Sequence, residues 1–526
     1  MSFSVVVFIF GLFLAIQNVS YCSDDINYWK KLGLEDIKKS REIKIINKPA
    51  KNVIIFIGDG MGPTTVTASR IYGKTEKGNF AFEKFTNLGL LKTYSADKLV
   101  PDSCSTATAL FNGVKANQKT AGVDQTVRYN DCAASLKPSA QHDSIIDWGQ
   151  AAGKSTGFVT TTRVTHATPS ALYAHTPNRK WECENTMPKG SPCKDIAKQL
   201  IEDLPGKNIQ VIMGGGRQCL QSNVTSTDAD PIDTWSCLST DGRDLIREWE
   251  KDKIIRKLSH AFIENNEQLS KLDAEKTDFL LGIFAKGHLK LDYARDKGPK
   301  GMPSLANMTE KAIEVLRKNK NGYILMVEGG MIDQSHHRGH ARQALDETVA
   351  FNLAIEKALE MTNEQETLII VTADHSHSLV FAGYSDRNNS ILNVAQSSPM
   401  DKIPYTSLLY GTGGPNNFQY HIDNNTVLRN DPSKNNTQDF EYSQQSAVLN
   451  DEVTHSGTDV AIYANGPMAH LFNSVHEQTY VAYVISYAAN IGPLKTLHSS
   501  ENSVLCHFSA SNLIILCLAV IIFQLN

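Results

Sequence analysis

The sequence predicts an α/β protein with a mostly parallel central sheet flanked by helices. The first observation is a set of apolar runs without polar alternation, at residues 52–57, 155–161, 209–213, 279–284, 323–327 and 367–372. Strands buried on both faces have this pattern, which is typical of parallel sheets. The second observation is that helical patterns lie between several of these runs, for example at 308–317 and 341–361. Such segments provide the crossover connections that parallel strands need.

The composition is that of a globular protein. Of 526 residues, 41% are hydrophobic and 21% are charged, which allows a large buried core. The formal net charge is −4 and the isoelectric point is near 6.5. Because no basic excess is available to neutralise phosphates along a strand, we expect small-molecule partners and no nucleic acid.

The two ends have the features of targeting segments. Residues 1–22 contain an apolar run at 5–16 followed by small residues, which predicts a secretory signal peptide, although no basic residue precedes the run. Residues 513–523 are apolar but too short to span a bilayer. They follow a polar spacer and small residues, so 503–526 are predicted to be a signal that is removed and replaced by a glycosylphosphatidylinositol (GPI) anchor. The alternative is a simple hydrophobic tail anchor.

Cysteines and glycosylation sequons agree with export to the extracellular face of the membrane. The chain has nine cysteines, and the close pair Cys219 and Cys237 can form a disulfide in an oxidising compartment, although spacing does not fix connectivity. Sequons predict glycans at Asn223, Asn307, Asn388, Asn424 and Asn435.

The first stretch after the signal peptide, residues 26–43, is charged and amphipathic. Its pattern predicts a helix that packs on the body of the protein or on a partner subunit.

Several predicted strands are followed by residues of the types that commonly bind metal ions in proteins. These are Asp59, the segment 166–168 with His166 and Thr168, then Glu328 with Asp333 and His337, and finally Asp374 with His375. Ligands of open α/β sheets bind at the carboxyl ends of the strands. Each group considered alone could instead be a tight turn, the end of a strand, or a helix N-terminus with Asp and His on its surface. Because separate strands converge on one edge, we predict a metal centre. Carboxylate with imidazole suits zinc, and a carboxylate set apart suits magnesium.

Ser103 is the candidate nucleophile. It follows Pro101 and Asp102 and opens a helix rich in small residues. A helix start favours an anion, so a serine placed there beside a metal can attack an anionic substrate. The alternative is an ordinary N-cap serine.

Together these motifs carry a family resemblance. The segments 58–62, 101–109, 161–169, 327–337, 372–377 and 454–455 resemble those of the alkaline phosphatases. The spacings and the anchored ends are similar to the animal cell-surface type, including that of insects, and the resemblance covers about residues 26–494. It implies hydrolysis of small phosphate monoesters at alkaline pH through a phosphoserine intermediate.

The resemblance also implies roles for individual residues. Two zinc ions and one magnesium ion per subunit are expected, the first zinc on Asp333, His337 and His455, the second on Asp59, Asp374 and His375, and the magnesium on Asp59, Thr168 and Glu328. Ser103 corresponds to the phosphorylated nucleophile and Arg179 to the guanidinium that clamps phosphoryl oxygens. His166 and His336 match positions around the magnesium and the first zinc, and His166 is expected, with Arg179, to bind the substrate.

The same resemblance implies the organisation of the chain. Residues 23–500 are expected to fold as a single catalytic domain, with a surface insertion, the crown, at about 385–450. A homodimer is expected, with the N-terminal helix reaching across to the partner.

The chain also departs from the family pattern. A calcium site of animal members would match Glu248 and the carbonyl of Phe284, but Ala285 stands where a carboxylate is expected, so we expect this fourth site to be weak or lost. Cys132 and Cys193 match a family disulfide, and Cys104 is expected to be a buried free thiol.

Two alternative functions are weighed against this interpretation. A phosphodiesterase or sulfatase of the same superfamily generally lacks the Asp-Ser helix or the magnesium set around Glu328, and both are present here. An anchored receptor with an inactive domain is disfavoured because the catalytic positions are chemically intact.

Overall fold

The computed structural model describes residues 25–495. The predicted signal peptide at 1–22 and the predicted anchor signal at 503–526 lie outside the described residues. Contacts divide the chain into one unit up to Ile45 and a second unit from Ile46 onward. Within residues 25–495, no helix has both the length and the apolar character needed to cross a membrane.

The first unit contains the predicted N-terminal helix, α2 (Ile26–Glu42). Asp25 caps it by accepting hydrogen bonds from the backbone N–H groups of Asn27 and Tyr28, each 2.9 Å long. No residue of this helix is buried, and its apolar residues Trp29 and Leu34 are exposed.

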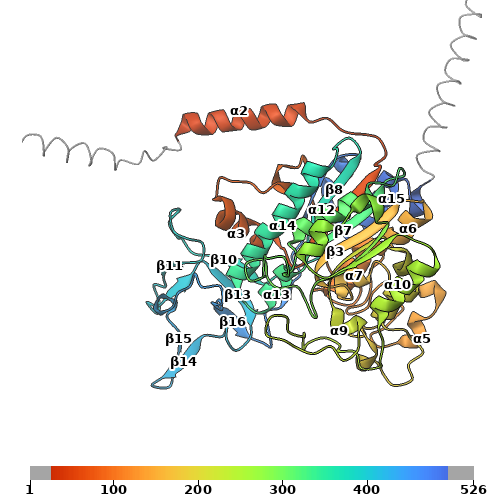
Figure 1. Ribbon diagram of the computed structural model, residues 1–526. Helices are drawn as coiled ribbons and strands as arrows, with labels where there is room; N and C mark the ends of the chain where they lie inside the picture. The colour runs from red at the N-terminus through yellow and green to blue at the C-terminus, as the bar shows by residue number, and fades with distance from the viewer. Residues whose placement is uncertain (1–24, 496–526) are drawn as a thin grey trace, which may run out of the picture. The chain divides into compact units, whose positions relative to one another are not determined.

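The second unit is organised around a 10-stranded sheet (Figure 1). From one edge to the other the strands are β19 (Ser474–Glu477), β2 (Asn87–Lys92), β18 (Val460–Asn465), β8 (Thr367–Thr372), β1 (Asn52–Gly58), β7 (Tyr323–Gly329), β3 (Ser155–Arg163), β4 (Val211–Gly215), β6 (Phe279–Ile283) and β5 (His260–Ile263). Every pairing in it is parallel except those of β18, which runs antiparallel to both β2 and β8. The predicted mostly parallel sheet is confirmed.

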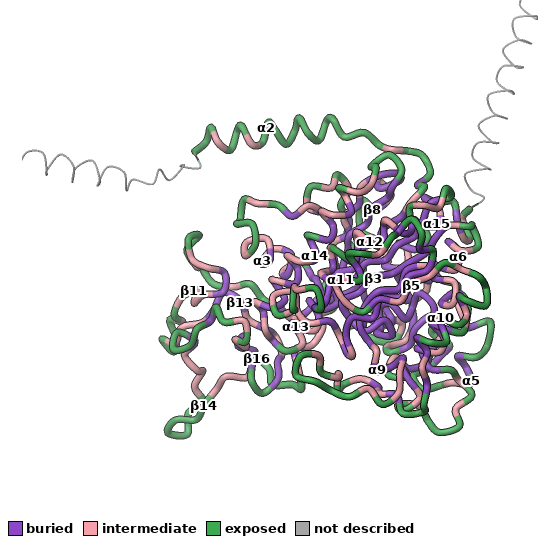
Figure 2. Tube along the Cα trace, in the orientation of Figure 1, coloured by how far each residue is buried: buried purple, intermediate pink, exposed green. Residues whose placement is uncertain are grey.

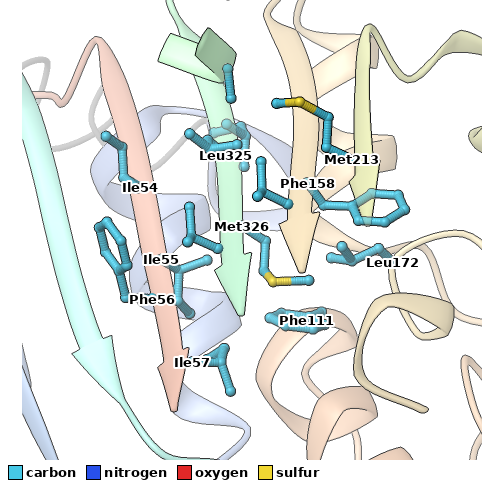
Figure 3. Packing of buried hydrophobic residues seen from close by; sticks show 14 of the residues in the cluster. Ile54, Ile55, Phe56, Ile57, Phe111, Phe158, Leu172, Met213, Leu325 and Met326 are labelled. Carbon is cyan, nitrogen blue, oxygen red and sulfur yellow. The ribbon is translucent and has the colours of Figure 1, made fainter. Parts of the chain in front are cut away.

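The centre of the sheet is the most deeply buried part of the protein. Strand β1 pairs with β7 and β8 on its two sides, and residues from Val53 to Ile57 have no exposed surface. Figure 3 shows Ile54 to Ile57 packed beside Leu325 and Met326 of β7 and Phe158 of β3. Figure 2 shows the same region as buried. Removal of this apolar surface from water is the main stabilising contribution to the fold.

Helices cover both faces of the sheet. Leu316 of α12 lies against Gly157 of β3. Gly149 of α6 lies against Thr156, the residue before Gly157 in the same strand. Successive strand residues point to opposite faces, so α12 and α6 lie on opposite sides. The helices of this unit are α3 (Pro63–Lys74), α4 (Ser103–Asn112), α5 (Cys132–Ser135), α6 (Ile145–Ala151), α7 (Ala167–Ser170), α8 (Ile196–Glu202), α9 (Arg217–Leu220), α10 (Leu245–Ile255), α11 (Asn266–Lys271), α12 (Leu305–Leu316), α13 (Met331–His337), α14 (Ala341–Met361) and α15 (Tyr480–Ala489).

Short strands lie in and next to the predicted crown segment at about 385–450. The strand just before it is β10 (Leu379–Phe381), and those within it are β11 (Val394–Ser397), β12 (Pro404–Thr406), β13 (Leu408–Gly413), β14 (Tyr420–Asp423), β15 (Thr426–Arg429) and β16 (Ser446–Leu449). In Figure 1 they gather at one side of the unit, coloured cyan and light blue. The hairpin of β14 and β15 exposes Ile422 and Val427.

The disulfides confirm one predicted pairing and correct another. Cys132 and Cys193 are joined, as expected. Cys237 is joined to Cys183, so the predicted pair of Cys219 and Cys237 is wrong. Cys219 lies in α9 with its side chain in the core, where its Sγ is 3.3 Å from the carbonyl oxygen of Cys237. Cys219 and Cys237 are therefore neighbours in the fold, but Cys219 contacts the backbone carbonyl of Cys237, and the thiol of Cys237 is bonded to Cys183.

Candidate active site

The strand ends bring the predicted ligands to one edge of the sheet. Asp59 follows β1, Asp374 and His375 follow β8, and Glu328 ends β7. These strands are parallel neighbours, so their carboxyl ends meet. His455 comes from β17 (His455–Ser456), which pairs with β9 (Ser376–His377) just beyond β8.

The first group consists of Asp333, His337 and His455. Nδ1 of His337 lies 2.9 Å from the carbonyl oxygen of Val453. Nδ1 of His455 lies 2.8 Å from that of Pro101. Because a carbonyl oxygen only accepts, each ring donates there and leaves a lone pair on Nε2. The two Nε2 atoms are 3.0 Å apart, and each is 3.4 Å from Oδ1 of Asp333. Acceptors that face one another in this way form a site for a cation.

His377 joins this group, although it was not among the predicted ligands. Its Nε2 lies 2.6 Å from Oδ1 of Asp333. Burial alone would raise the pKa of Asp333, but His337 and His377 hold that pKa well below its usual value. Strand periodicity is the signal that could have found His377, because residues two apart, such as His375 and His377, lie on one face of an extended segment.

The second group consists of Asp59, Asp374 and His375, all fully buried. Nε2 of His375 lies 3.2 Å from Oδ2 of Asp374 and 3.5 Å from Oδ1 of Asp59. Asp374 also accepts a hydrogen bond of 3.0 Å from the backbone N–H of Gly60. Among residues 25–495, neither carboxylate oxygen of Asp59 has a hydrogen-bond partner. Burial, followed by the charges of Asp333 and Asp374, raises the pKa of Asp59 well above its usual value.

The third group surrounds Glu328. Asp59, His166 and Glu328 bring one ligand atom each within 4.8 Å of one another. Oε1 of Glu328 and Oγ1 of Thr168 are both buried and lack a hydrogen-bond partner in the described part of the chain. Thr160 donates to the other oxygen of Glu328. Burial nevertheless raises the pKa of Glu328 to about 7. An added cation would compensate the charges of these carboxylates.

Ser103 stands beside the second group. It is the first residue of α4, and its N-cap, Asp102, accepts a hydrogen bond of 3.3 Å from the backbone N–H of Ser105. Oγ of Ser103 lies 3.1 Å from Nε2 of His375. The predicted hydroxyl at a helix start beside a metal site is therefore present.

Arg179 lies over the same helix start. Its Nη1 donates a hydrogen bond of 3.0 Å to Oδ2 of Asp102, and its Nη2 lies 3.2 Å from Nε2 of His166. Both contacts fix the plane of the guanidinium close to Ser103. A guanidinium held in this way can donate to two oxygens of a phosphoryl group.

Two further predicted residues lie outside these three groups. His336 hydrogen-bonds Oγ1 of Thr65 at 3.0 Å and the hydroxyl of Tyr410 at 2.7 Å, and its ring lies 4.9 Å from that of His377, next to the first group. Glu248 is exposed in the first turn of α10, and none of the candidate metal-binding groups found among the described residues contains it. Occupancy by calcium stays a prediction for metal analysis.

The arrangement as a whole has the parts of a metal-dependent phosphoryl-transfer site. Three groups of carboxylates and imidazoles can hold cations, and a hydroxyl and a guanidinium both lie at the start of α4, the hydroxyl in contact with His375 of the second group. Such a site can neutralise an anionic substrate, supply a nucleophile and stabilise a leaving oxygen.

Comparison with known proteins agrees with this chemistry. Residues 50–491 match the family model described as alkaline phosphatase. The tissue-nonspecific isozyme of alkaline phosphatase from Mus musculus is 43% identical over 480 residues, which are 89% of each chain. Alkaline phosphatase 4 of Drosophila melanogaster is 39% identical over 510 residues, covering 91% of this chain and 84% of its own. Among solved structures, the alkaline phosphatase of Thermus thermophilus matches with a TM-score of 0.59 and 19% identity, covering 84% of this chain and 92% of its own. That likeness supports the fold.

Proposed function

The chain belongs to the alkaline phosphatase family and hydrolyses phosphate monoesters with the help of metal ions, and on this premise we propose that Ser103 is its nucleophile. The observation that carries the proposal is the position of the Ser103 hydroxyl, at a helix start and 3.1 Å from Nε2 of His375. Attack by this oxygen on phosphorus expels the alcohol and leaves a phosphoseryl group. Water then hydrolyses that group and releases inorganic phosphate.

The proposal assigns two zinc ions and one magnesium ion. Asp333, His337 and His455 hold one zinc, Asp59, Asp374 and His375 hold the other, and Asp59, Thr168 and Glu328 hold the magnesium. The donor sets support this, since imidazole with carboxylate suits zinc, and unpartnered carboxylate and hydroxyl oxygens suit magnesium. When bound, the metals lower the pKa of attacking oxygens and neutralise the leaving oxygen.

Arg179 binds the substrate in this scheme. Its contacts with Asp102 and His166 leave the guanidinium at the helix start that carries Ser103. Two of its N–H groups donate to phosphoryl oxygens, which aligns phosphorus with the serine oxygen.

The direct experiment combines metal analysis with assays of purified protein. We expect about two zinc ions and one magnesium ion per chain, and hydrolysis of an aryl phosphate that a chelator abolishes. Aryl phosphodiesters and aryl sulfates should be turned over far more slowly than the monoester. A metal-free protein that keeps its full activity would refute the assignment.

We also propose that the mature protein is a glycoprotein held at the outer face of the cell membrane by a GPI anchor. All the predicted sequon asparagines within the described residues are exposed, which supports glycosylation. A phosphatidylinositol-specific phospholipase should release active enzyme from membranes. Retention after that treatment would favour a hydrophobic tail anchor.

The proposed assembly is a homodimer. The exposed apolar residues of α2, such as Trp29 and Leu34, support a role for this helix in contacts between subunits. Light scattering of the released ectodomain should give twice the mass of one chain, and a monomer would refute the proposal.

A further inference from the structure

We propose that His288 is a positioning residue for the phosphate-binding arginine. It holds the ring of His166 in the orientation that accepts a hydrogen bond from Arg179. The inference rests on the proposed function, because the reaction reports the position of Arg179.

His288 follows β6, and its side chain is only 10% exposed. Its Nε2 lies 2.7 Å from Nη1 of Arg163. A guanidinium donates and never accepts, so Nε2 of His288 must be the acceptor. This hydrogen bond therefore fixes which edge of the imidazole faces Arg163.

Arg163 is a rigid support for this contact. Its Nε and Nη2 each donate a hydrogen bond of 2.8 Å to the carboxylate of Glu182. Arg163 is 5% exposed and Glu182 is 4% exposed, so the pair is buried and bidentate. Thr165, the residue before His166, also donates to Glu182, at 2.6 Å. Arg163 and the side chain of Thr165, which precedes His166, thus both donate to the carboxylate of Glu182.

His288 meets His166 edge to face. The ring centroids are 5.1 Å apart and the planes lie at 79°, a favourable arrangement for two aromatic rings. Nε2 of His166 lies 3.2 Å from Nη2 of Arg179, and by the same argument it is the acceptor. Without the ring of His288, the ring of His166 would lose one of the contacts that define its orientation.

The ring nitrogens not used in these bonds point to the same conclusion. Nδ1 of His166 and Nδ1 of His288 are buried and lack a hydrogen-bond partner in the described part of the chain. Buried polar groups are nearly always paired. The bond from Arg163 therefore uses only one of the two ring nitrogens of His288, and the contact with His166 gives the rest of the ring a role.

The chain of contacts ends at the nucleophile. Arg179 is held on one side by Asp102, at 3.0 Å, and on the other by His166. Asp102 moves with the helix of Ser103, and His166 is supported by His288. Loss of His288 should therefore weaken binding of the phosphoryl group more than it changes the chemical step.

Two variants separate the ring from the hydrogen bond. His288→Asn keeps an acceptor for Arg163 and removes the ring, whereas His288→Phe keeps a ring and removes the acceptor. We expect His288→Asn to raise the KM for an aryl phosphate and the inhibition constant for inorganic phosphate together by roughly 2- to 12-fold, the range of an aromatic contact. The kcat, calculated per active site from the amount of serine that can be phosphorylated, should stay within about twofold of the parent. The metal content should stay within the same range. His288→Phe keeps a ring against His166 but loses the bond that orients it, so its KM should rise less than that of His288→Asn.

A matched control and a second background complete the test. His260→Ala removes a similar edge-to-face contact, with Trp249 at 5.8 Å, on the distant edge strand β5, and should leave both constants unchanged. In an Arg179→Ala background, His288→Asn should have no further effect on KM, because the two residues act in series. If the asparagine variant does not fold, His288→Gln provides the same comparison.

Two results would overturn the inference. One is an unchanged KM and phosphate inhibition in His288→Asn with an active parent, and the other is an equal effect of that change with and without Arg179. An inactive parent would instead refute the proposed function.

Discussion

Nδ1 of His455 donates a hydrogen bond of 2.8 Å to the carbonyl oxygen of Pro101, two residues before Ser103. A proposed metal ligand from near the end of the chain is thus tied directly to the segment that carries the proposed nucleophile. The proposed cation site and Ser103 are therefore connected through Pro101 and Asp102.

The first prediction concerns this ligand. His455→Ala should lower zinc content and turnover together, because Asp333 and His337 alone form an incomplete zinc site and the leaving oxygen then develops charge without a cation beside it. Metal analysis of the purified variant and an aryl phosphate assay check both quantities. His421→Ala, an exposed histidine of the crown strand β14, is the control. Parental zinc in the His455 variant would contradict the ligand assignment.

The second prediction separates the phosphate clamp from the metal ligands. Arg179→Ala should lower kcat/KM for phosphate monoesters by about 10- to 10⁴-fold, because two charge-assisted hydrogen bonds, each worth roughly 1.5 to 3 kcal/mol, are lost and water partly replaces them. Zinc and magnesium should stay at parental levels. Arg256→Ala, at the end of α10, should change neither quantity. The assigned role fails if the Arg179 variant loses as much zinc as His455→Ala.

The third prediction identifies the nucleophile. Ser103→Ala should keep its metals but form no acid-stable phosphoenzyme, since the attacking oxygen is gone. Acid quenching with labelled phosphate, followed by peptide mapping, measures this. Ser433→Ala, at an exposed crown position, should trap phosphate like the parent. Covalent phosphate on the Ser103 variant would exclude this serine.

The fourth prediction concerns the free thiols. Burial raises the pKa of Cys104 to about 12, and burial followed by the charge of Glu182 raises the pKa of Cys219 well above its usual value. Neither thiol should react with iodoacetamide at pH 8 in the native state, and both should react after unfolding without a reductant. Mass spectrometry of the peptides checks this. Alkylation of Cys183 in place of Cys219 would show that the predicted pairing with Cys237 forms after all.

The fifth prediction concerns a buried carboxyl outside the metal groups. Burial raises the pKa of Glu347 to about 8, and Glu347 accepts a hydrogen bond of 2.5 Å from the backbone N–H of Asp292. Between about pH 4.5 and 8 the folded state holds a proton that the unfolded state has lost, so this group makes the free energy of unfolding fall as pH rises.

Glu347→Gln keeps an acceptor without the charge. The variant should match the parent near pH 4 and exceed it by a few kcal/mol near pH 9, since each pKa unit corresponds to about 1.4 kcal/mol. Denaturant unfolding at the two pH values measures the difference. Asp346→Asn is the neighbouring comparison: burial raises the pKa of Asp346 as well, but its side chain is less deeply buried, so the gain at pH 9 should be smaller than for Glu347→Gln. A variant that is less stable than the parent at pH 9 would show that the charged form of Glu347 is stabilising.

Periodicity and strand ends were sufficient to predict the parallel core and the convergence of Asp59, Glu328, Asp333 and Asp374. These signals are local. A strand buried on both faces has a continuous apolar run in its sequence, and the carboxyl ends of neighbouring parallel strands lie at the same edge of the sheet. The antiparallel strand β18 was not predicted, because its partners β2 and β8 are set by long-range pairing that leaves no local mark.

The same distinction applies within the site. The spacing from His375 could have placed His377 on the same strand face, but its contact with Asp333 was not predicted, because the two residues meet only when α13 and β9 pack together. The pairing of Cys183 with Cys237 was missed because the fold, rather than spacing along the chain, brings those two thiols together. His288 belongs to no motif, and its contact with His166 depends on how the loop after β6 folds back.

The order in which the chain is made gives the position of His455 a further consequence. A chain extended from its N-terminus acquires Asp59 first and His455 only near its end. The pair of Nε2 atoms from His337 and His455 therefore cannot form on a partly synthesised chain. Binding of a cation between these two rings must follow synthesis of nearly the whole polypeptide, so the protein can be loaded at this group only once β17, which carries His455, has been made.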